Sequence, residues 1–414
     1  MFTYNSNSTT LEEAMRTTEN DEPEITVQNI THKINKINSI ELSQATLPNV
    51  YLYYNYSKPG NPRFQEASSS VGGTFNRFVT GTVQKNYGVA AEYNVFAIPQ
   101  LFIKMKAAHN AVKASLFSTQ SKKSEFYYNM ALAYIGLCRA QNLVALQAKV
   151  FETSQSRYNE VEKSFSYGRA TKRDLLSAES EFLTSQAKLE KTNNDLITAQ
   201  QKYIDKFTKL HTNLTVPEVS LSSVAKNITE LKAAVESNNQ DLKSLEHAAK
   251  SYKAESYISA INALPTVTVG YREAYIIVDP ILSIPDYRQG TFYIQAKMDL
   301  LNMSKYLSTF KNNNEKNKKI AEAKVIKKNH STEAELLWNN TLTQEKMIDV
   351  LQKVVANSKE VYQITKKEVG YGSKSFTDEL EAKEYYTKSE IDLLEAKLQK
   401  ASNIYRLKYL TGKL

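Results

Sequence analysis

Hydrophobic residues recur at seven-residue intervals through two long parts of the chain. In the first part they occupy Met130, Leu137, Val144, Phe151, Tyr158 and Phe165, and then Leu175, Phe182, Leu189, Leu196, Tyr203 and Leu210. In the second part they occupy Ile348, Val355, Tyr362 and Val369, and then Ile391, Leu398 and Tyr405. A sustained seven-residue period is typical of long helices that pack along a narrow seam. The pattern therefore predicts coiled-coil helices whose remaining faces are polar and solvated.

Helix breakers divide each of these parts near its middle. No proline falls within residues 100–216 or 286–414, whereas glycines stand at Gly168 and Gly372. Proline and glycine are the residues that most often end a helix. Each part is therefore predicted to form two helices joined by a turn, and a helix of about 60 residues is about 90 Å long.

The sequences at the two turns are related. Residues 167–178 read YGRATKRDLLSA and residues 371–382 read YGSKSFTDELEA, with Tyr-Gly, an acid, a leucine and an alanine at matching steps. Another match, Leu47-Pro48 with Leu264-Pro265, begins two further stretches. The chain is therefore predicted to contain two copies of one unit, namely helix, two strands, long helix, turn and helix. Such duplication favours a ring-like or pseudo-symmetric assembly.

Four other stretches alternate apolar and polar residues, as half-buried strands do. They are LPNVYLYYNYS (47–57), YGVAAEYNVFAI (87–98), LPTVTVGYREAYIIV (264–278) and TFYIQAKMDLL (291–301). Strands of about ten residues cross a bilayer when tilted, although a soluble sheet shows the same alternation. Four strands are too few to close a barrel, for which about eight are needed, and lipid does not tolerate open edges. Transmembrane strands would therefore require several chains to share one barrel, and three chains would supply twelve strands.

The composition indicates no enzyme chemistry. The 414 residues carry a net charge of +9, but basic residues are interspersed with acids and no nucleic-acid motif accompanies them. The single cysteine, Cys138, excludes an intramolecular disulfide and a cysteine metal site. The five histidines lie far apart, and neither a P-loop nor a nucleophile motif is present. We therefore expect no catalysis, no metal, no cofactor and no nucleic-acid partner.

The sequence contains no segment that would anchor it by a helix. No apolar run approaches the roughly 18 residues of a membrane-spanning helix, and the start, MFTYNSNSTTLEEA, shows no signal peptide. Either the protein stays inside the cell, or its leader is absent from this sequence.

The ordered, duplicated set of motifs resembles the TolC-like outer membrane efflux proteins, the trimeric channel-tunnels of Gram-negative bacteria. The resemblance covers almost the whole chain, from LEEAMRTTENDEPEI (11–25), through LPNVYLYYNY, LPTVTVGY and both turns, to LKYLTGKL (407–414). It implies a mainly α fold with a small β part, in which four transmembrane strands per chain contribute to a twelve-stranded trimeric β-barrel. Long antiparallel coiled-coil helical hairpins would form a tunnel that extends into the periplasm.

This fold implies an organisation in six segments. The first copy would comprise a helix in 1–46, a barrel hairpin in 47–99 and a long helical hairpin in 100–216 with its tip near 168. The second copy would comprise a linker and helix in 217–263, a barrel hairpin in 264–304 and a long helical hairpin in 305–414 with its tip near 372.

The resemblance also assigns roles to residues of the two tips. Asp378 and Glu381 match the two acids that form a lumenal ring in the family, with Glu in place of the usual Asp at the second position. Asp174 and Lys374 match the acid and the base of the closing latch, with Lys in place of Arg, and Val369 stands where the family has a tyrosine. The docking surface for a periplasmic adaptor would be Gly168, Arg169, Ala170, Thr171, Gly372, Ser373, Lys374 and Ser375.

The implied function is a passive exit duct in the outer membrane, for efflux or type I protein secretion. Its partners would be two further copies of the chain, an adaptor (membrane fusion) protein, an inner-membrane transporter that supplies the energy, and outer-membrane lipid. The alternative is a soluble coiled-coil scaffold protein without channel activity, because the sequence shows no leader.

Overall fold

The structure, a computed structural model of the chain, forms two compact units built from separate stretches of sequence. The hairpin unit comprises Met1–Thr31, Leu116–Ser244 and Glu322–Leu414. The sheet unit comprises His32–Ser115 and Leu245–Ala321. The structure describes residues 10–18, 23–44, 47–57, 63–67, 76–80, 84–95, 97–207, 210–211, 214–262, 264–277, 286–299 and 303–414.

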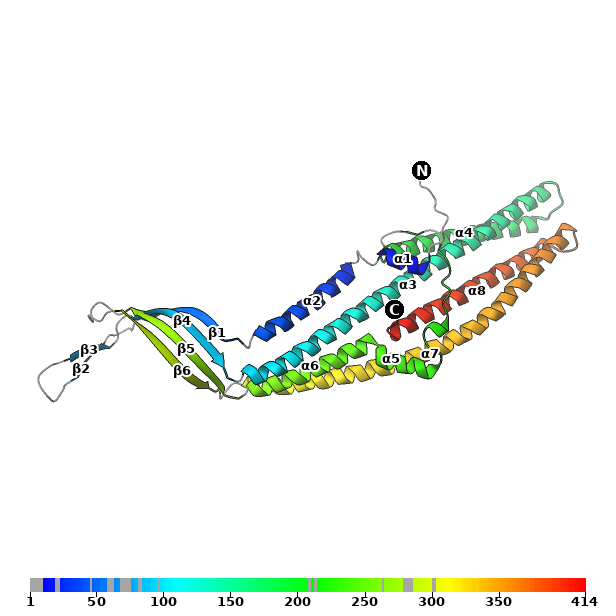
Figure 1. Ribbon diagram of the computed structural model, residues 1–414. Helices are drawn as coiled ribbons and strands as arrows, with labels where there is room; N and C mark the ends of the chain where they lie inside the picture. Colours follow the sequence, from blue (N-terminus) through cyan, green and yellow to red (C-terminus); the bar gives the residue numbers. More distant parts are fainter. Residues whose placement is uncertain are drawn as a thin grey trace. The chain divides into compact units, whose positions relative to one another are not determined.

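Four long helices form two antiparallel pairs, as the seven-residue period predicts (Figure 1). Helix α3 (Ala97–Ser166) pairs with α4 (Lys172–Ile204), and α7 (Met303–Gly370) pairs with α8 (Phe376–Leu410). The other helices are shorter: α1 (Leu11–Thr18), α2 (Pro23–Gln44), the 3-10 turn η1 (Leu221–Ser223), α5 (Ile228–Asn238) and α6 (Gln240–Asn262).

The seams of the two hairpins are built from equivalent residues. In the first hairpin the rings of Tyr158 and Phe182 stack with centroids 5.6 Å apart, and the hydroxyls of Ser154 and Ser185 lie 2.5 Å apart. Both serines are buried. The second hairpin repeats both contacts 204 residues later, with Tyr362 on Tyr386 and Ser358 bonded to Ser389. The internal repeat is therefore also a repeat of packing contacts.

Two hydrophobic clusters hold the hairpin unit together. The first joins α1, α3, the end of α4 and α8, and its largest fully buried side chains are Met130, Tyr134, Leu137, Tyr203 and Phe207. The second packs α5 against α7 and α8 through residues such as Leu231, Trp338 and Leu407. Burial of each large apolar side chain contributes about 1.5–3 kcal/mol, so these clusters are the main stabilising contacts of the unit.

The sheet unit contains a four-stranded antiparallel sheet in the order β1-β4-β5-β6. The strands are β1 (Asn49–Ser57), β4 (Gln84–Asn94), β5 (Thr266–Ile277) and β6 (Tyr287–Lys297). Two strands come from each copy of the repeat, and β4 and β5 pair across the boundary between the copies. The predicted mainly α fold with a small four-stranded part is therefore confirmed.

The structure contains two strands beyond the four that alternation predicts. They are the short strands β2 (Arg63–Ala67) and β3 (Asn76–Thr80), which lie between β1 and β4 and pair with each other. Strand β4 also ends earlier than the alternation suggests, because α3 begins at Ala97. Pro99 then lies in the first turn of a helix, where proline is tolerated because its missing N–H has no partner within the helix.

Candidate functional site

Both turns that join the long helices have the same backbone design. Gly168 and Gly372 adopt left-handed conformations, with φ of 71° and 74°. In the first turn the N–H of Gly168 donates to Phe165 O and the N–H of Arg169 donates to Ser164 O, and the second turn repeats this pair of bonds at Gly372 and Ser373. This is the Schellman ending of a helix, in which glycine relieves the strain of positive φ. The repeated Tyr-Gly therefore marks two helix ends of one kind.

The following helices begin with matching capping boxes. Thr171 Oγ1 accepts the N–H of Asp174, and the Asp174 carboxylate accepts the N–H of Thr171 at 2.9 Å. Ser375 and Asp378 form the same pair of bonds, also with 2.9 Å for the second. A capping box satisfies backbone donors that a helix start leaves without partners. These bonds lower the pKa of both aspartates below the usual value, so both carry negative charge at neutral pH.

The residues predicted to dock an adaptor lie on these turns. Apart from Ala170, which is half-buried, they are exposed. The tyrosines of the two Tyr-Gly pairs, which the sequence analysis did not include in the docking surface, lie beside them. Tyr167 is 76% exposed and Tyr371 is 86% exposed. Exposed tyrosines are common in protein interfaces. Each turn thus presents one aromatic ring beside polar and charged groups.

The predicted latch residues have other partners in this structure. Lys374 Nζ lies 3.1 Å from the carboxylate of Glu368, in the last turn of α7. Asp174 is engaged in its own capping box. Among the described residues, no ion pair joins Asp174 to Lys374. Asp378 and Glu381 are both exposed, on the first turn and a half of α8. The lumenal ring and the latch stay predictions, because both depend on other copies of the chain or on another state.

A cleft with charged walls lies between the two hairpins behind the turns. It encloses about 530 Å³, and α3, α4, α7 and α8 contribute to its lining. Lys383 Nζ of α8 donates to the carbonyl of Lys149 and to Thr153 Oγ1 on α3, and so ties one hairpin to the other. Burial lowers the pKa of Lys383 and raises the pKa of Glu181 on the opposite wall. Sequence analysis missed this cleft because most of its lining residues, Lys383 and Glu181 among them, lie outside the apolar repeat.

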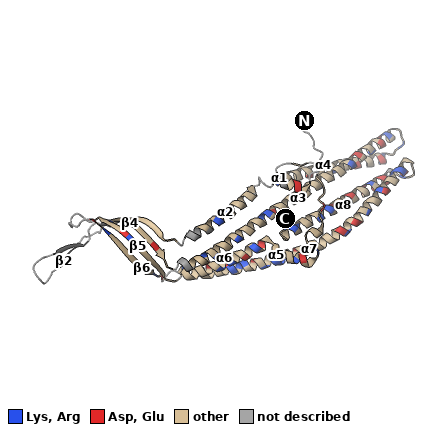
Figure 2. Cartoon of the chain, viewed as in Figure 1, with Lys and Arg blue, Asp and Glu red and all other residues tan. Residues whose placement is uncertain are grey.

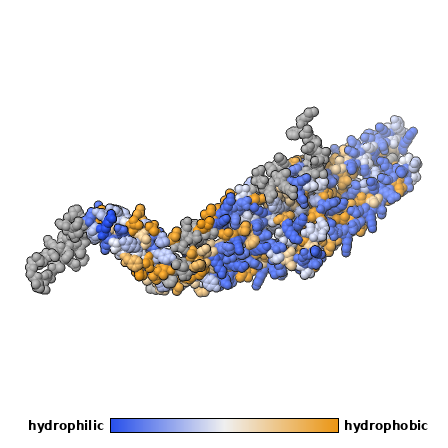
Figure 3. Space-filling model, in the orientation of Figure 1, coloured by the Kyte–Doolittle hydropathy of each residue, from blue (hydrophilic) through white to orange (hydrophobic). Residues whose placement is uncertain are grey.

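The two faces of the sheet have opposite character. Cross-strand pairing places Leu52, Val89, Tyr271 and Phe292 on one face, and these side chains are between 46% and 82% exposed. Figure 3 shows hydrophobic residues gathered over the sheet, and Figure 2 shows few charged residues on its strands. This face is largely apolar, although Glu273 lies on it opposite Val89. Exposure of so many apolar side chains to water is unfavourable, so the face indicates a surface that contacts lipid or protein.

The other face carries a polar network. Glu92 Oε1 accepts hydrogen bonds from Tyr51 Oη at 2.7 Å and from Tyr293 Oη. Tyr293 reaches Glu92 across Gly270, where a Cβ atom would lie 2.5 Å from the Tyr293 ring. The guanidinium of Arg272 lies 3.8 Å from Glu92 and stacks on Tyr53. The network thus pairs Glu92 with Arg272 on this face. The sequence signal that could have revealed it was the presence of one acid and one base within strands of alternating pattern.

The described residues show neither a metal site nor a helical membrane anchor. No group of His, Cys, Asp and Glu within them could hold a metal ion. None of the helices in the described ranges is long and apolar enough to cross a membrane.

Comparisons with known proteins give matches by structure alone. No protein-family model matches the sequence, and no curated protein matches it. The outer-membrane channel OprN is similar with a TM-score of 0.81, covering 98% of this chain and 90% of that chain at 12% identity. The outer membrane protein VceC from Vibrio cholerae is similar with a TM-score of 0.77, covering 97% and 95% at 12% identity. The open state of the Neisseria gonorrhoeae MtrE outer membrane channel gives 0.74, covering 97% and 88% at 16% identity.

Two of these structures are outer-membrane channels and the third is an outer membrane protein, and each matches nearly the full length of the chain. At identities of 12% to 16% the similarity concerns the fold. The chain therefore has the fold of the TolC-like outer-membrane channels that its sequence resembles.

Proposed function

We propose that the chain is one protomer of a trimeric outer-membrane channel that serves as a passive exit duct for efflux or type I secretion. The observation that carries this proposal is the four-stranded sheet, whose one face is largely apolar and exposed while the other holds a polar network. A sheet with lipid on one side and water on the other needs this division. The strands are also as long as a tilted crossing of the bilayer requires, at 9 to 12 residues.

The open edges of the sheet support association into a trimer. Strands β1 and β6 are the outer strands of the sheet, and lipid does not tolerate unpaired edges. Pairing β6 of one copy with β1 of the next would remove every edge, and three copies would give twelve strands. Exposed apolar side chains on the helices support further contact between copies, namely Val27, Ile30, Ile34 and Ile37 on α2, Phe102 on α3 and Phe310 on α7.

The turns are proposed to face the periplasmic end of the duct, where an adaptor and an inner-membrane transporter would meet it. Each turn is rigidly built and presents an exposed tyrosine, so three copies would present six similar tips. Transport energy would come from the transporter. Asp378 and Glu381 are proposed to form acidic rings that bind cations at the narrow end, and Asp174 and Lys374 to form the latch in a closed state.

The proposal is tested by where the protein resides and by whether it conducts ions. We expect it in the outer-membrane fraction, as a trimer that dissociates on a gel only after heating, and with single-channel conductance in planar bilayers. A monomer in the soluble fraction that gives no conductance would overturn the proposal and favour the soluble scaffold.

The acidic ring has its own test in the same bilayers. Replacing Asp378 with Asn and Glu381 with Gln removes the charges while keeping the side-chain shapes. We expect block by multivalent cations to weaken, since three copies lose six charges. Asp174→Asn is the matched control, because Asp174 has the same capping bonds on the other hairpin. Equal block in all three proteins would show that the two acids do not line the constriction.

A further inference from the structure

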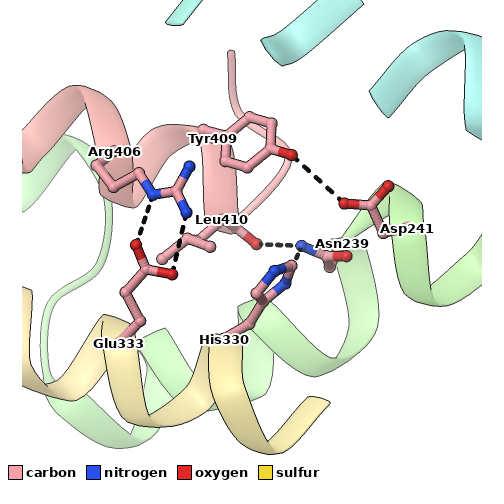
Figure 4. Close-up of polar contacts among 7 residues, drawn as sticks. All are labelled: Asn239, Asp241, His330, Glu333, Arg406, Tyr409 and Leu410. Atoms are coloured by element: carbon pink, nitrogen blue, oxygen red, sulfur yellow. Dashed lines mark hydrogen bonds and ion pairs between the residues drawn. The ribbon is translucent and has the colours of Figure 1, made fainter. Parts of the chain in front are cut away.

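Asn239 joins three helices of the hairpin unit at a single buried side chain. It ends α5 and directly precedes α6, and only 2% of its surface is exposed. Its Oδ1 accepts the N–H of Leu242 in the first turn of α6, at 3.1 Å. Its Nδ2 donates to the carbonyl of Leu410 at the end of α8, also at 3.1 Å. Figure 4 shows the Asn239 side chain between these helices, with His330 of α7 beside it.

These two bonds fix the orientation of the Asn239 amide. A backbone N–H can only donate, so it requires the amide oxygen, and a carbonyl can only accept, so it requires the amide nitrogen. The nitrogen then also faces His330, whose Nδ1 lies 3.1 Å away. His330 Nδ1 must therefore accept a hydrogen bond, which it can do only while it carries no proton. The contact exists for the neutral imidazole alone.

Charged groups from each neighbouring helix surround this contact. Glu333 of α7 forms a bidentate pair with Arg406 of α8, with N–O distances of 2.6 and 3.1 Å. Asp241 of α6 accepts from Ser121 at 2.5 Å and from Tyr409 at 3.4 Å. On α5, Glu236 pairs with Lys327 of α7 at 3.0 Å.

The balance of these surroundings disfavours the charged imidazole. Burial lowers the pKa of His330 below its ordinary 6.5, Arg406 lowers it further, and Asp241 and Glu333 oppose the shift. The ring is therefore neutral at neutral pH, in agreement with the hydrogen bond that it accepts.

We propose that His330 and Asn239 form a proton-sensitive joint that holds the end of α8 and the α5–α6 junction to α7 at neutral pH and releases them in acid. Protonated Nδ1 would place its N–H against the Asn239 NH₂, so that two donors face each other. The amide cannot rotate to relieve this without losing the bonds to Leu242 and Leu410. The inference is independent of the proposed channel, because it concerns only contacts within one chain.

The chain contains a matched histidine of opposite polarity. His247 Nδ1 lies 3.0 Å from Asn110 Oδ1, and Asn110 Nδ2 donates to the Lys106 carbonyl at 2.8 Å. Here the amide oxygen faces the ring, so His247 Nδ1 donates, and protonation of the other ring nitrogen keeps the bond. Burial lowers the pKa of both histidines, but only His330 loses a hydrogen bond when it is protonated.

Hydrogen exchange of the full chain between pH 7.5 and 5 tests the joint, with each rate corrected for the intrinsic effect of pH. Because the folded pKa of His330 is lowered, its stabilisation is complete above about pH 6.5 and is lost as the pH falls through the folded pKa. Exchange in peptides covering 228–244 and 404–414 should rise up to about tenfold per pH unit over this range. Unchanged corrected rates in the wild type would overturn the proposal.

Two substitutions separate titration from packing. His330→Asn supplies an amide oxygen in place of Nδ1 and cannot be protonated. The corrected exchange rates of the two peptides should therefore stay constant with pH in this variant. In the control, His247→Asn, they should change with pH as in the wild type. Glu333→Gln removes a carboxylate that favours the charged ring and should move the wild-type midpoint to lower pH. If His330→Asn does not fold, Glu333→Gln still tests the proposal. The proposal requires the pH midpoint of the exchange to follow the pKa of His330, so an unchanged midpoint in Glu333→Gln would contradict it.

Discussion

The apolar face of the sheet can be tested with one pair of neighbouring residues. Ile294 lies on that face and is 68% exposed, whereas Gln295 lies on the polar face and is also exposed. Both are in β6, one step apart, and therefore at almost the same depth in a membrane. We expect Ile294→Arg to destabilise the assembled protein and Gln295→Arg to have little effect.

The expected magnitude follows from the position of Ile294 in its strand. It lies three residues from the end of β6 at Lys297, which is about 10 Å along a strand and about 7 Å in depth at a tilt of 45°. The apolar band of such barrels is about 25 Å tall, and arginine costs about 2–4 kcal/mol at its midplane and about 0–1 kcal/mol at its edges. Ile294 lies between these limits, so we expect about 1–3 kcal/mol per chain.

The assay is the loss of trimer in lipid vesicles as urea concentration rises, followed on a gel without heating. Three copies share one barrel, so Ile294→Arg should cost about 3–9 kcal/mol per trimer, and its midpoint should shift far below that of Gln295→Arg. In a soluble sheet both positions are simply exposed, and both changes would stay within about 0.5 kcal/mol. Equal midpoints for the two variants would refute the assignment of the apolar face to lipid.

Three further predictions concern single residues. Gly372→Ala should destabilise the second hairpin by about 1–2 kcal/mol, because φ is positive at this residue. Gly136→Ala is the control, because Gly136 lies within α3 and an added Cβ would meet no other atom there; this change should be neutral or stabilising by up to about 1 kcal/mol. Chemical denaturation measures both. The capping bond lowers the folded pKa of Asp378, so its contribution is constant above the usual 3.8 and is lost as the pH falls through the folded pKa. Corrected hydrogen exchange in 371–382 should therefore rise only in that acid range, and Asp378→Asn should abolish the change. Burial raises the pKa of Cys138 to about 11, so a colorimetric thiol reagent at pH 8 should react with it about 100-fold more slowly than with the unfolded chain; equal rates would contradict its burial.

The positions of the long helices, the turns and the strands were predictable because they depend on periodic patterns and repeated motifs. The seven-residue repeat identified Tyr158 and Phe182, whose rings stack across the first seam. The Tyr-Gly pairs located both turns, since a left-handed glycine has few substitutes at a helix end. Alternation located the four strands because one face is apolar and the other polar.

The contacts that fix individual side chains could not be predicted in this way. Asn239 bonds to the carbonyl of Leu410, 171 residues away, and no sequence pattern links these two residues. Glu92 and Tyr293 are similarly remote in sequence and meet only because Gly270 leaves room between them. Such contacts depend on which strands and helices become neighbours, and no local pattern contains that information.

Comparison of the two hairpins shows where the copies have diverged. The seam residues are retained, since Ser154 and Ser185 correspond to Ser358 and Ser389. The charged residues of the cleft are not, because the positions equivalent to Arg157, Glu181 and Lys383 in the other copy are Val361, Tyr385 and Glu179. A residue that packs within a hairpin meets the same surroundings in both copies, whereas one that faces the other hairpin does not. The two copies therefore share the contacts within each hairpin and differ on the surface where the hairpins face each other. The hydrogen bond from Lys383 to the Lys149 carbonyl of α3 lies on that surface.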